Sequence, residues 1–174
     1  MARKAFLASY PLDKFYELTC NHHPQRWKDY TLPNDSPLRN INNWSNEIHY
    51  FNNDNVTASN EIFQLPSDVG GLYVFYLKGP NLPFFENYIL YIGRCHITEG
   101  QNLRKRALEY QKDKRSTIKQ MMETWKENLY YRYYVDSDND RIDNNEAFLI
   151  RAIAPYYNEQ IPDSIDIQPT VSAF

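Results

Sequence analysis

Cysteine is scarce in this chain, with only Cys20 and Cys95 among 174 residues. The two form no CxxC pattern, and the group Cys20, His22 and His23 is followed by no second ligand pair at zinc spacing. The sequence therefore argues against a zinc knuckle. Scarce, unpatterned cysteine is typical of a protein in a reducing compartment, so we expect a cytoplasmic protein.

Long apolar runs are also missing. No stretch approaches the roughly 18 apolar residues of a membrane-spanning helix. The basic start Met1–Leu7 has no adequate apolar run for a signal peptide. We therefore expect no membrane association.

The chain also lacks the net positive charge that would favour nucleic-acid binding, since its formal net charge is −3. The charges are nevertheless unevenly distributed. Residues 94–132 hold 10 basic and 5 acidic residues, a net of +5, and residues 136–174 hold 2 basic and 8 acidic residues, a net of −6. This asymmetry permits a basic groove on an acidic protein. A solvated helix face is the plainer explanation of the same charges.

Tyrosine, in contrast, is abundant, with 15 residues. Several lie in two segments, 71–76 and 88–94, that are rich in Tyr, Ile, Val and Phe and are flanked by Gly or Pro. Residues 78–83 between them are typical of a turn-rich loop. We expect an antiparallel hairpin in which Tyr73 shares a face with Phe75, and Tyr91 with Ile89. Each tyrosine has a strand glycine nearby, which often marks close approach of another group.

A helix is predicted over about 102–111, and Thr98 and Gln101 before it match the pattern of a capping box. Its inward stripe contains the following four residues: Leu103, Arg106, Ala107 and Tyr110. Arg104 lies off this stripe, and Lys105 faces outward.

The rest of the sequence predicts a helix over 116–127 and a strand over 129–135. The acidic run 136–140 lacks the glycine and the terminal glutamate of a calcium-binding loop, so a solvated turn is expected there. A last helix is expected to start near Asp143 and to end at Pro155. Glu146 shares a stripe with Leu149, Ile150 and Ile153. It either completes a capping box with Asp143 or, as a carboxylate on an apolar stripe, pairs with Arg106 or a cation.

Five of these features, in this order, resemble the GIY-YIG nuclease family over residues 70–160. They are Gly71-Leu72-Tyr73, Tyr91-Ile92-Gly93, the helix Asn102–Arg106 with its arginine, Glu146 on a later helix, and Asn158 after Pro155. The gap from Tyr91 to Arg106 is about five residues longer than is usual in that family. The resemblance implies an α/β fold in which a small, mostly antiparallel three-stranded sheet is flanked by helices in the order β-β-α-α-β-α. This domain would cover 70–162, with an ordered, loop-rich extension (1–69) packing on it and a tail (163–174).

The same resemblance implies a metal-dependent endonuclease that cleaves double-stranded DNA in a restriction, mobile-element or defence setting. One Mg²⁺ or Mn²⁺ ion would be held by Glu146, and Arg106 would grip the phosphate. Tyr91, or else Tyr73, would accept a proton from water. Tyr110 and Asn158 complete the catalytic set implied by the family, and the candidate substrate-binding residues are Arg94, Arg104 and Lys105.

A second function stays open from the sequence. The fold could serve as a catalytically silent module that holds nucleic acid or a protein, and residues 1–69 offer a surface for a protein partner. In that case Tyr73 and Tyr91 are core strand residues, Tyr110 packs beneath its helix, and Asn158 is a turn residue.

Overall fold

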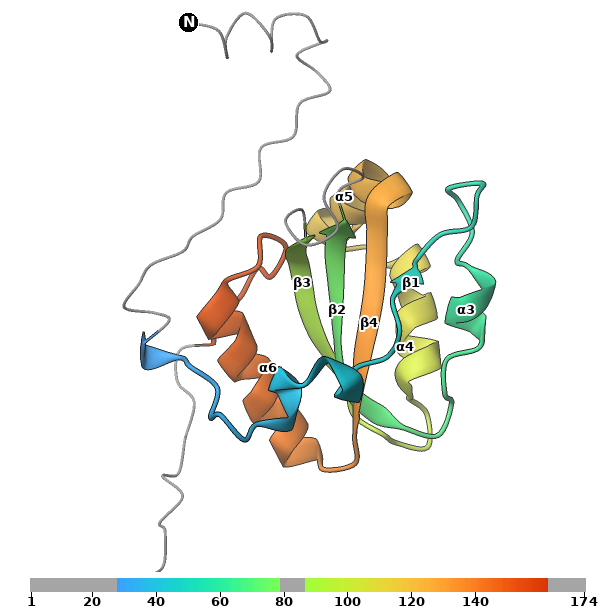
Figure 1. The fold of residues 1–174 in the computed structure, drawn as a ribbon. Helices are drawn as coiled ribbons and strands as arrows, with labels where there is room; N and C mark the ends of the chain where they lie inside the picture. The colour runs from blue at the N-terminus through green and yellow to red at the C-terminus, as the bar shows by residue number, and fades with distance from the viewer. Residues whose placement is uncertain (1–27, 79–86, 163–174) are drawn as a thin grey trace, which may run out of the picture.

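A four-stranded antiparallel sheet in the order β1-β4-β2-β3 forms the centre of the protein (Figure 1). The computed structural model describes residues 28–78 and 87–162. The strands are β1 (Ile48–His49), β2 (Gly70–Lys78), β3 (Asn87–Cys95) and β4 (Leu129–Asp136). Every strand pair is antiparallel.

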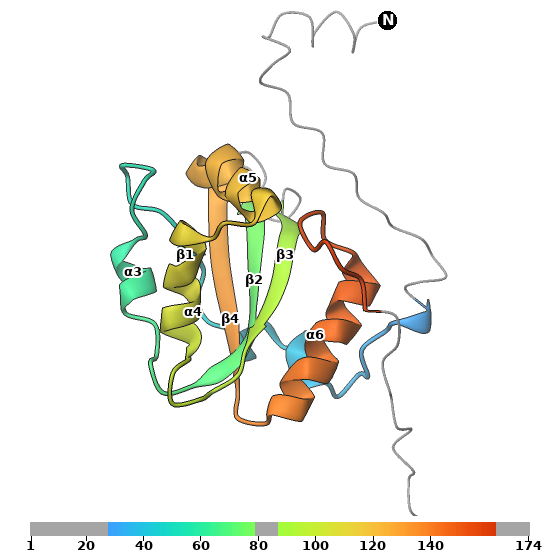
Figure 2. The same ribbon diagram turned by 180° about the vertical axis from the view of Figure 1, so that it is seen from behind.

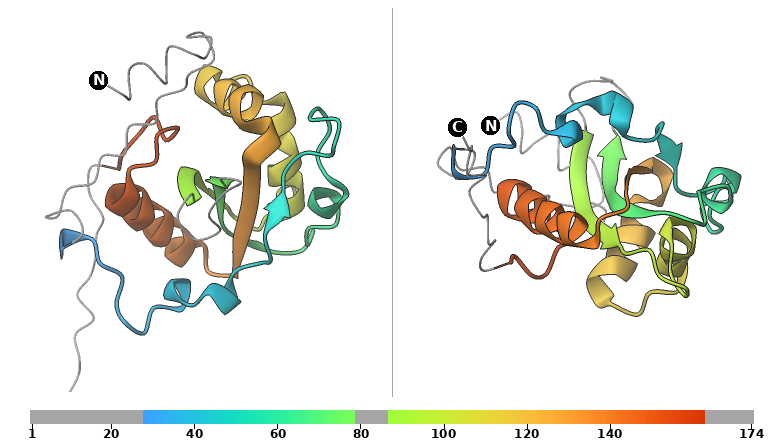
Figure 3. Two further views of the ribbon diagram at one scale, coloured as in Figure 1. Left: turned by 45° about the horizontal axis from the view of Figure 1, so that its top comes forward. Right: turned by 90° about the horizontal axis from the view of Figure 1, so that it is seen from below.

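Helices cover both faces of the sheet (Figures 2 and 3). The α-helices are α3 (Asn60–Phe63), α4 (Leu103–Glu109), α5 (Ser116–Trp125) and α6 (Asn139–Ile153). Short 3-10 helices are η2 (Pro37–Arg39), η3 (Ile41–Asn43), η4 (Tyr110–Lys112) and η5 (Lys126–Asn128). One core joins α3, α4 and α5 to one face of the sheet, and a second core joins α6, η2 and Trp44 to the other face. The α/β class and the mostly antiparallel sheet are thus confirmed.

The prediction of three strands is wrong, because the segment before Gly70 supplies a fourth. In β1, Ile48 pairs with Tyr131 and His49 with Tyr130 of β4. Two residues are too few to show the alternation by which a strand is recognised in sequence. The same segment also enters the main core, where the Tyr50 hydroxyl donates to the carbonyl of Ala107 in α4 at 2.7 Å.

A register shift between Phe75 and Tyr76 places Tyr91 and Ile89 on opposite faces of β3, so the prediction that they share a face is wrong. Phe75 pairs with Tyr91, but Tyr76 pairs with Ile89, so one extra residue, Leu90, lies on β3. Such a bulge breaks the alternation of side chains. Ile89 therefore packs in the core beneath α6, and Tyr91 packs in the core beneath α4, on the side of Tyr73 and Phe75.

The acidic run 136–140 is a solvated turn only in part, since its first residue ends β4 and its last two begin α6, and α6 does not start near Asp143. Asp136 ends β4 with 4% of its surface exposed and binds the guanidinium of Arg141. Asp138 is the N-cap of α6, because its side chain accepts from the backbone N–H of Arg141 at 3.0 Å. Glu146 consequently lies well inside α6, so the capping-box explanation of this carboxylate is wrong.

The cap of α4 also differs from the prediction. Thr98 and Gln101 pair with each other through their backbones instead of forming a capping box. The Asn102 side chain caps the helix by accepting from the backbone N–H of Lys105 at 2.9 Å.

Other predictions fall on residues that are not described. The Cys20 group, most of the predicted loop 78–83 and the tail 163–174 lie outside the described residues. Within residues 28–78 and 87–162, no helix has the length and apolar character needed to cross a membrane.

Gly71→Ala is expected to lower the free energy of unfolding by at least about 1–3 kcal/mol, the cost of one strained backbone conformation. Gly71 has a φ of +146°, and a Cβ there would lie 1.9 Å from the backbone oxygen of Tyr134 on β4. Gly100→Ala is the matched control, since an added Cβ at Gly100 meets nothing within 4 Å. Urea unfolding of both variants is the measurement, and equal midpoints would contradict the role of Gly71.

Candidate active site

A pocket of about 420 Å³ opens beside β3, where β2, the loop 96–101, α4 and α6 meet. Two strands, two helices and this loop contribute side chains to it. The lining residues are Tyr73, Tyr91, Arg94, Cys95, His96, Thr98, Gln101, Arg106 and Glu146. The structure therefore brings together five of the residues that the sequence singled out: Tyr73, Tyr91, Arg94, Arg106 and Glu146.

A buried hydrogen-bond cluster forms the inner wall of this pocket. Tyr73 is fully buried, and its hydroxyl lies 2.7 Å from the hydroxyl of Tyr110. Arg106 Nε donates to the Tyr73 oxygen at 3.1 Å, and the guanidinium also lies over the Tyr110 ring, 5.1 Å from its centroid. Arg106 thus points inward, as its position on the stripe of α4 predicted. Tyr110 lies behind the pocket, in contact with its wall.

Gly93 makes room for this cluster. It pairs with Tyr73 across the β2–β3 ladder, and a Cβ at position 93 would lie 2.5–2.6 Å from the phenol atoms of Tyr73. Any side chain at Gly93 would therefore push the phenol away from Arg106. This contact explains Gly93, the strand glycine near Tyr91, which the sequence had suggested as a point of close approach, whereas Gly71 lies against the backbone of Tyr134.

Burial sets the protonation of the two inner tyrosines. Burial raises the pKa of Tyr73, and the nearby Arg106 offsets only part of that rise. Burial also raises the pKa of Tyr110 well above its usual value, with further rises from Tyr73 and Tyr91. Both phenols therefore stay protonated at neutral pH and act as hydrogen-bonding groups.

The outer wall carries an ion-pair network. Arg94 Nη1 lies 2.6 Å from Oε2 of Glu146, and its Nε lies 3.0 Å from Oδ1 of Asp143. His96 Nε2 binds the same Asp143 oxygen. The Glu146 side chain is only 16% exposed, and burial raises its pKa although Arg94 lowers it in part. Glu146 is therefore a buried carboxylate whose negative charge Arg94 offsets only in part.

Three predicted residues lie away from the pocket. Arg104 donates from Nε to the carbonyl of Leu65 at 2.5 Å, and the Lys105 ammonium binds the carbonyl of Gly100. Both line a different depression on the outer side of α4. Asn158 instead holds the backbone of Ile92 on β3, accepting from its N–H at 2.9 Å and donating to its carbonyl at 2.8 Å. Asn158 is therefore a positioning residue for β3.

Sequence reasoning missed several residues of the site. Cys95 could have been found, because it follows Tyr91 and Gly93 at alternate positions of one strand; burial raises the pKa of its thiol to about 11. Arg115, which precedes α5, lies 5.9 Å from the centroid of the Tyr91 ring. No local pattern marked Arg115. The other unpredicted lining residues are His96, Thr98 and Gln101, which follow β3 in an irregular loop.

Glu146 is the residue that suits a metal ion. Among the residues described, no three His, Cys, Asp or Glu side chains gather as a protein cage for a metal would require. Mg²⁺, however, is usually held by one or two carboxylates and keeps several of its waters. A single carboxylate whose charge is disfavoured by burial fits that donor set.

Comparison of the chain with protein-family models, with curated proteins and with solved structures found no match. The resemblance to GIY-YIG nucleases stays a prediction from the sequence.

Glu146→Gln is expected to raise the melting temperature at pH 8, with a gain that shrinks toward pH 4. Burial raises the pKa of Glu146 above its ordinary value of 4.5. The folded state therefore binds more protons than the unfolded chain just above pH 4.5, and the wild type loses stability as pH rises through this window. A glutamine does not titrate. Each 1 kcal/mol gained corresponds to about 2–4 °C for a chain of this size.

Thermal unfolding in excess chelator across this pH range is the measurement, and Glu123→Gln on α5 is the control. The Glu123 side chain is 68% exposed, so its neutralisation should have little effect at any pH. A lower melting temperature for Glu146→Gln at pH 8 would show instead that the Arg94–Glu146 pair stabilises the fold.

Proposed function

We propose that this protein is a metal-dependent endonuclease that hydrolyses DNA phosphodiester bonds in the pocket described above. The observation that carries the proposal is the convergence of an arginine, two tyrosines and a carboxylate on one pocket from four elements of the fold. Hydrolysis of a phosphodiester needs a phosphate anchor, a group that takes the proton of the attacking water, and stabilisation of the leaving oxygen. The pocket offers a candidate for each.

Arg106 is the phosphate anchor in this scheme. Its Nε is held by Tyr73 at 3.1 Å and its Nη1 by Glu109 at 3.1 Å, so the guanidinium is fixed before substrate arrives. Among the described residues Nη2 has no hydrogen-bond partner, so its hydrogens could bind a phosphate oxygen. A guanidinium binds phosphate through paired hydrogen bonds, and prior orientation lowers the cost of forming them.

Tyr91 is the candidate general base, and Tyr73 its positioning partner. Tyr73 is already committed to Arg106 and Tyr110, and its raised pKa opposes proton removal. Tyr91 is 8% exposed at the pocket wall, with Arg115 beside its ring. The hydroxyl of Tyr91, unlike that of Tyr73, is not committed to a buried hydrogen-bond pair with Tyr110.

Glu146 would hold the Mg²⁺ or Mn²⁺ ion, and such an ion supplies charge stabilisation to the phosphate and leaving oxygens. In the structure Arg94 neutralises this carboxylate. If a metal ion neutralised Glu146 in place of Arg94, the positive charge of Arg94 would be available to bind a phosphate. A restriction, mobile-element or defence setting agrees with such an activity.

The second candidate is the catalytically silent binding module. The observation in its favour is the 2.6 Å ion pair of Arg94 with Glu146, in which the two charges already satisfy each other. Incubation of the full chain with supercoiled plasmid, in Mg²⁺, in Mn²⁺ and in excess chelator, separates the two. Nicking or linearisation only with metal supports the nuclease, and intact plasmid in all three favours the binding module.

In the same assay, Arg106→Ala is expected to lower the cleavage rate by about 10²–10³, the usual cost of one transition-state donor. Arg104→Ala is the matched control from the same helix, since Arg104 binds the Leu65 carbonyl away from the pocket, and it should lose far less activity. Equal losses, or a larger loss in Arg104→Ala, would show that the wrong arginine has been assigned.

Tyr91→Phe is expected to abolish nearly all turnover, because only the hydroxyl is lost and the ring packing is kept. Single-turnover cleavage against pH is the measurement: the wild-type rate should rise with pH, and the Tyr91 variant should lose this rise. Tyr73→Phe should instead lower stability by about 1–3 kcal/mol, since it leaves the buried Tyr110 hydroxyl without its partner. Normal cleavage by Tyr91→Phe together with its loss in Tyr73→Phe would exchange the two roles.

A further inference from the structure

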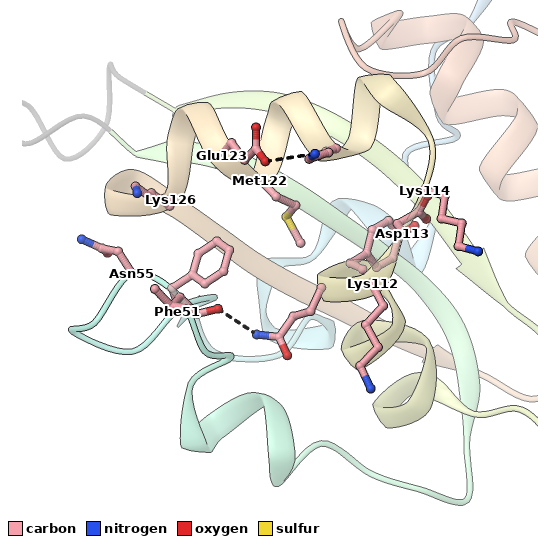
Figure 4. Close-up of a pocket in the computed structure, with 12 residues that line it drawn as sticks. Phe51, Asn55, Lys112, Asp113, Lys114, Met122, Glu123 and Lys126 are labelled. Atoms are coloured by element: carbon pink, nitrogen blue, oxygen red, sulfur yellow. Dashed lines mark hydrogen bonds and ion pairs between the residues drawn. The ribbon is translucent and has the colours of Figure 1, made fainter.

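A second depression, of about 540 Å³, lies on the far side of Tyr110 from the candidate active site. Figure 4 shows its walls: η4 and the residues after it, α5, and the turn that follows Phe51. We call it the lysine groove. Its lining residues are Phe51, Asn55, Val56, Tyr110, Gln111, Lys112, Asp113, Lys114, Lys119, Met122, Glu123 and Lys126.

The groove has an apolar floor and a hydrogen bond between two of its walls. Gln111 Nε2 donates to the carbonyl of Val56 at 3.3 Å, which ties two of the walls together. Phe51 and Met122 are buried and face the interior of the groove (Figure 4). Since Phe51 is only 7% exposed, it offers no free ring on which a base could stack. The groove is therefore suited to a ligand recognised by its charge.

Lysine supplies that charge at the rim. Four lysines outnumber the two carboxylates, and both carboxylates are already paired, Asp113 with Arg115 at 2.6 Å and Glu123 with Lys119 at 3.7 Å. Within the part of the chain that the structure describes, the ammonium groups of Lys112, Lys114 and Lys126 form no ion pair. Unpaired lysines around a groove attract a polyanion, and lysine is a common point contact for phosphate.

Arg115 links this groove to the candidate active site. Its guanidinium lies 5.9 Å from the Tyr91 ring centroid and 6.0 Å from that of Tyr110. Tyr91 lines the active-site pocket and Tyr110 lines the groove, so Arg115 stands at the boundary between the two. A nucleic-acid strand that leaves the pocket past Arg115 would reach Lys112 and Lys114 next.

We propose that the lysine groove binds the phosphates that flank the scissile one on the DNA backbone. This inference rests on the proposed nuclease function, and it assigns backbone contact to Lys112, Lys114 and Lys126. Lys112 also borders the depression on the outer side of α4, but Arg104 and Lys105, which line that depression, lie outside the groove.

The test is the salt dependence of binding to a labelled 30-base-pair duplex, measured by fluorescence anisotropy on the full chain in excess chelator. Each lysine that contacts a duplex phosphate contributes about 0.9 to the slope of log affinity against log salt. The double variant Lys112→Gln, Lys126→Gln should therefore reduce the slope by about 2. A control with Lys28→Gln and Lys105→Gln removes the same charge outside the groove and should change the slope by less than half as much.

Equal changes in the two double variants would overturn the proposal, as would a wild type that does not bind the duplex. Stronger competition by polyglutamate than by unlabelled duplex would also overturn it, in favour of an acidic protein partner. Hydrolysis of bis(p-nitrophenyl) phosphate separates this proposal from the function itself. That small diester reaches only the catalytic pocket, so the groove variant should hydrolyse it as the wild type does. If the wild type hydrolyses neither the diester nor plasmid, the nuclease function fails, while the salt slopes still decide what the groove binds.

Discussion

A phenol sealed from water needs hydrogen-bond partners, and meeting that need at Tyr73 connects most of the candidate site. The hydroxyl of Tyr73 joins β2 to α4 through Arg106 and to η4 through Tyr110. It fits only because the residue across the ladder, Gly93, has no side chain. One buried hydroxyl thus links a strand pair, a helix and the orientation of the arginine.

The electrostatics of the two pocket walls differ in kind. On the inner wall, the positive charge of Arg106 is surrounded by neutral phenols whose pKa values are raised by burial. On the outer wall, Glu146 is ionised at a cost and depends on Arg94 for balance. The pocket therefore has a cation on its inner side and a carboxylate, whose ionisation is disfavoured by burial, on its outer side. These charges are in place before any ligand enters. Such prior arrangement of charge is the usual source of catalytic stabilisation.

Local patterns in the sequence predicted the parts of this structure that depend on short-range rules. The hairpin, the inward position of Arg106 on α4 and the apolar stripe around Glu146 each follow from the period of a strand or a helix. What failed depended on contacts between distant segments. The bulge at Leu90 and the pairing of β1 with β4 are decided by neighbouring strands. Arg115 reaches Tyr91 only because the chain turns between η4 and α5, and the role of Asp138 as the cap of α6 was hidden among equivalent acidic residues.

The amide of Asn158 has a consequence beyond the site. Because it both accepts from the N–H of Ile92 and donates to its carbonyl, it occupies the outer edge of β3 as a neighbouring strand would. The backbone of Tyr157 adds a further bond, to the carbonyl of Leu90. Exposed strand edges are templates on which other chains can pair and aggregate. At the other end of the sheet, β1 is only two residues long. Both edges of the sheet are therefore poor templates for strand pairing. The loop after α6 covers the edge of β3 and so hinders edge-to-edge association with other copies of the protein.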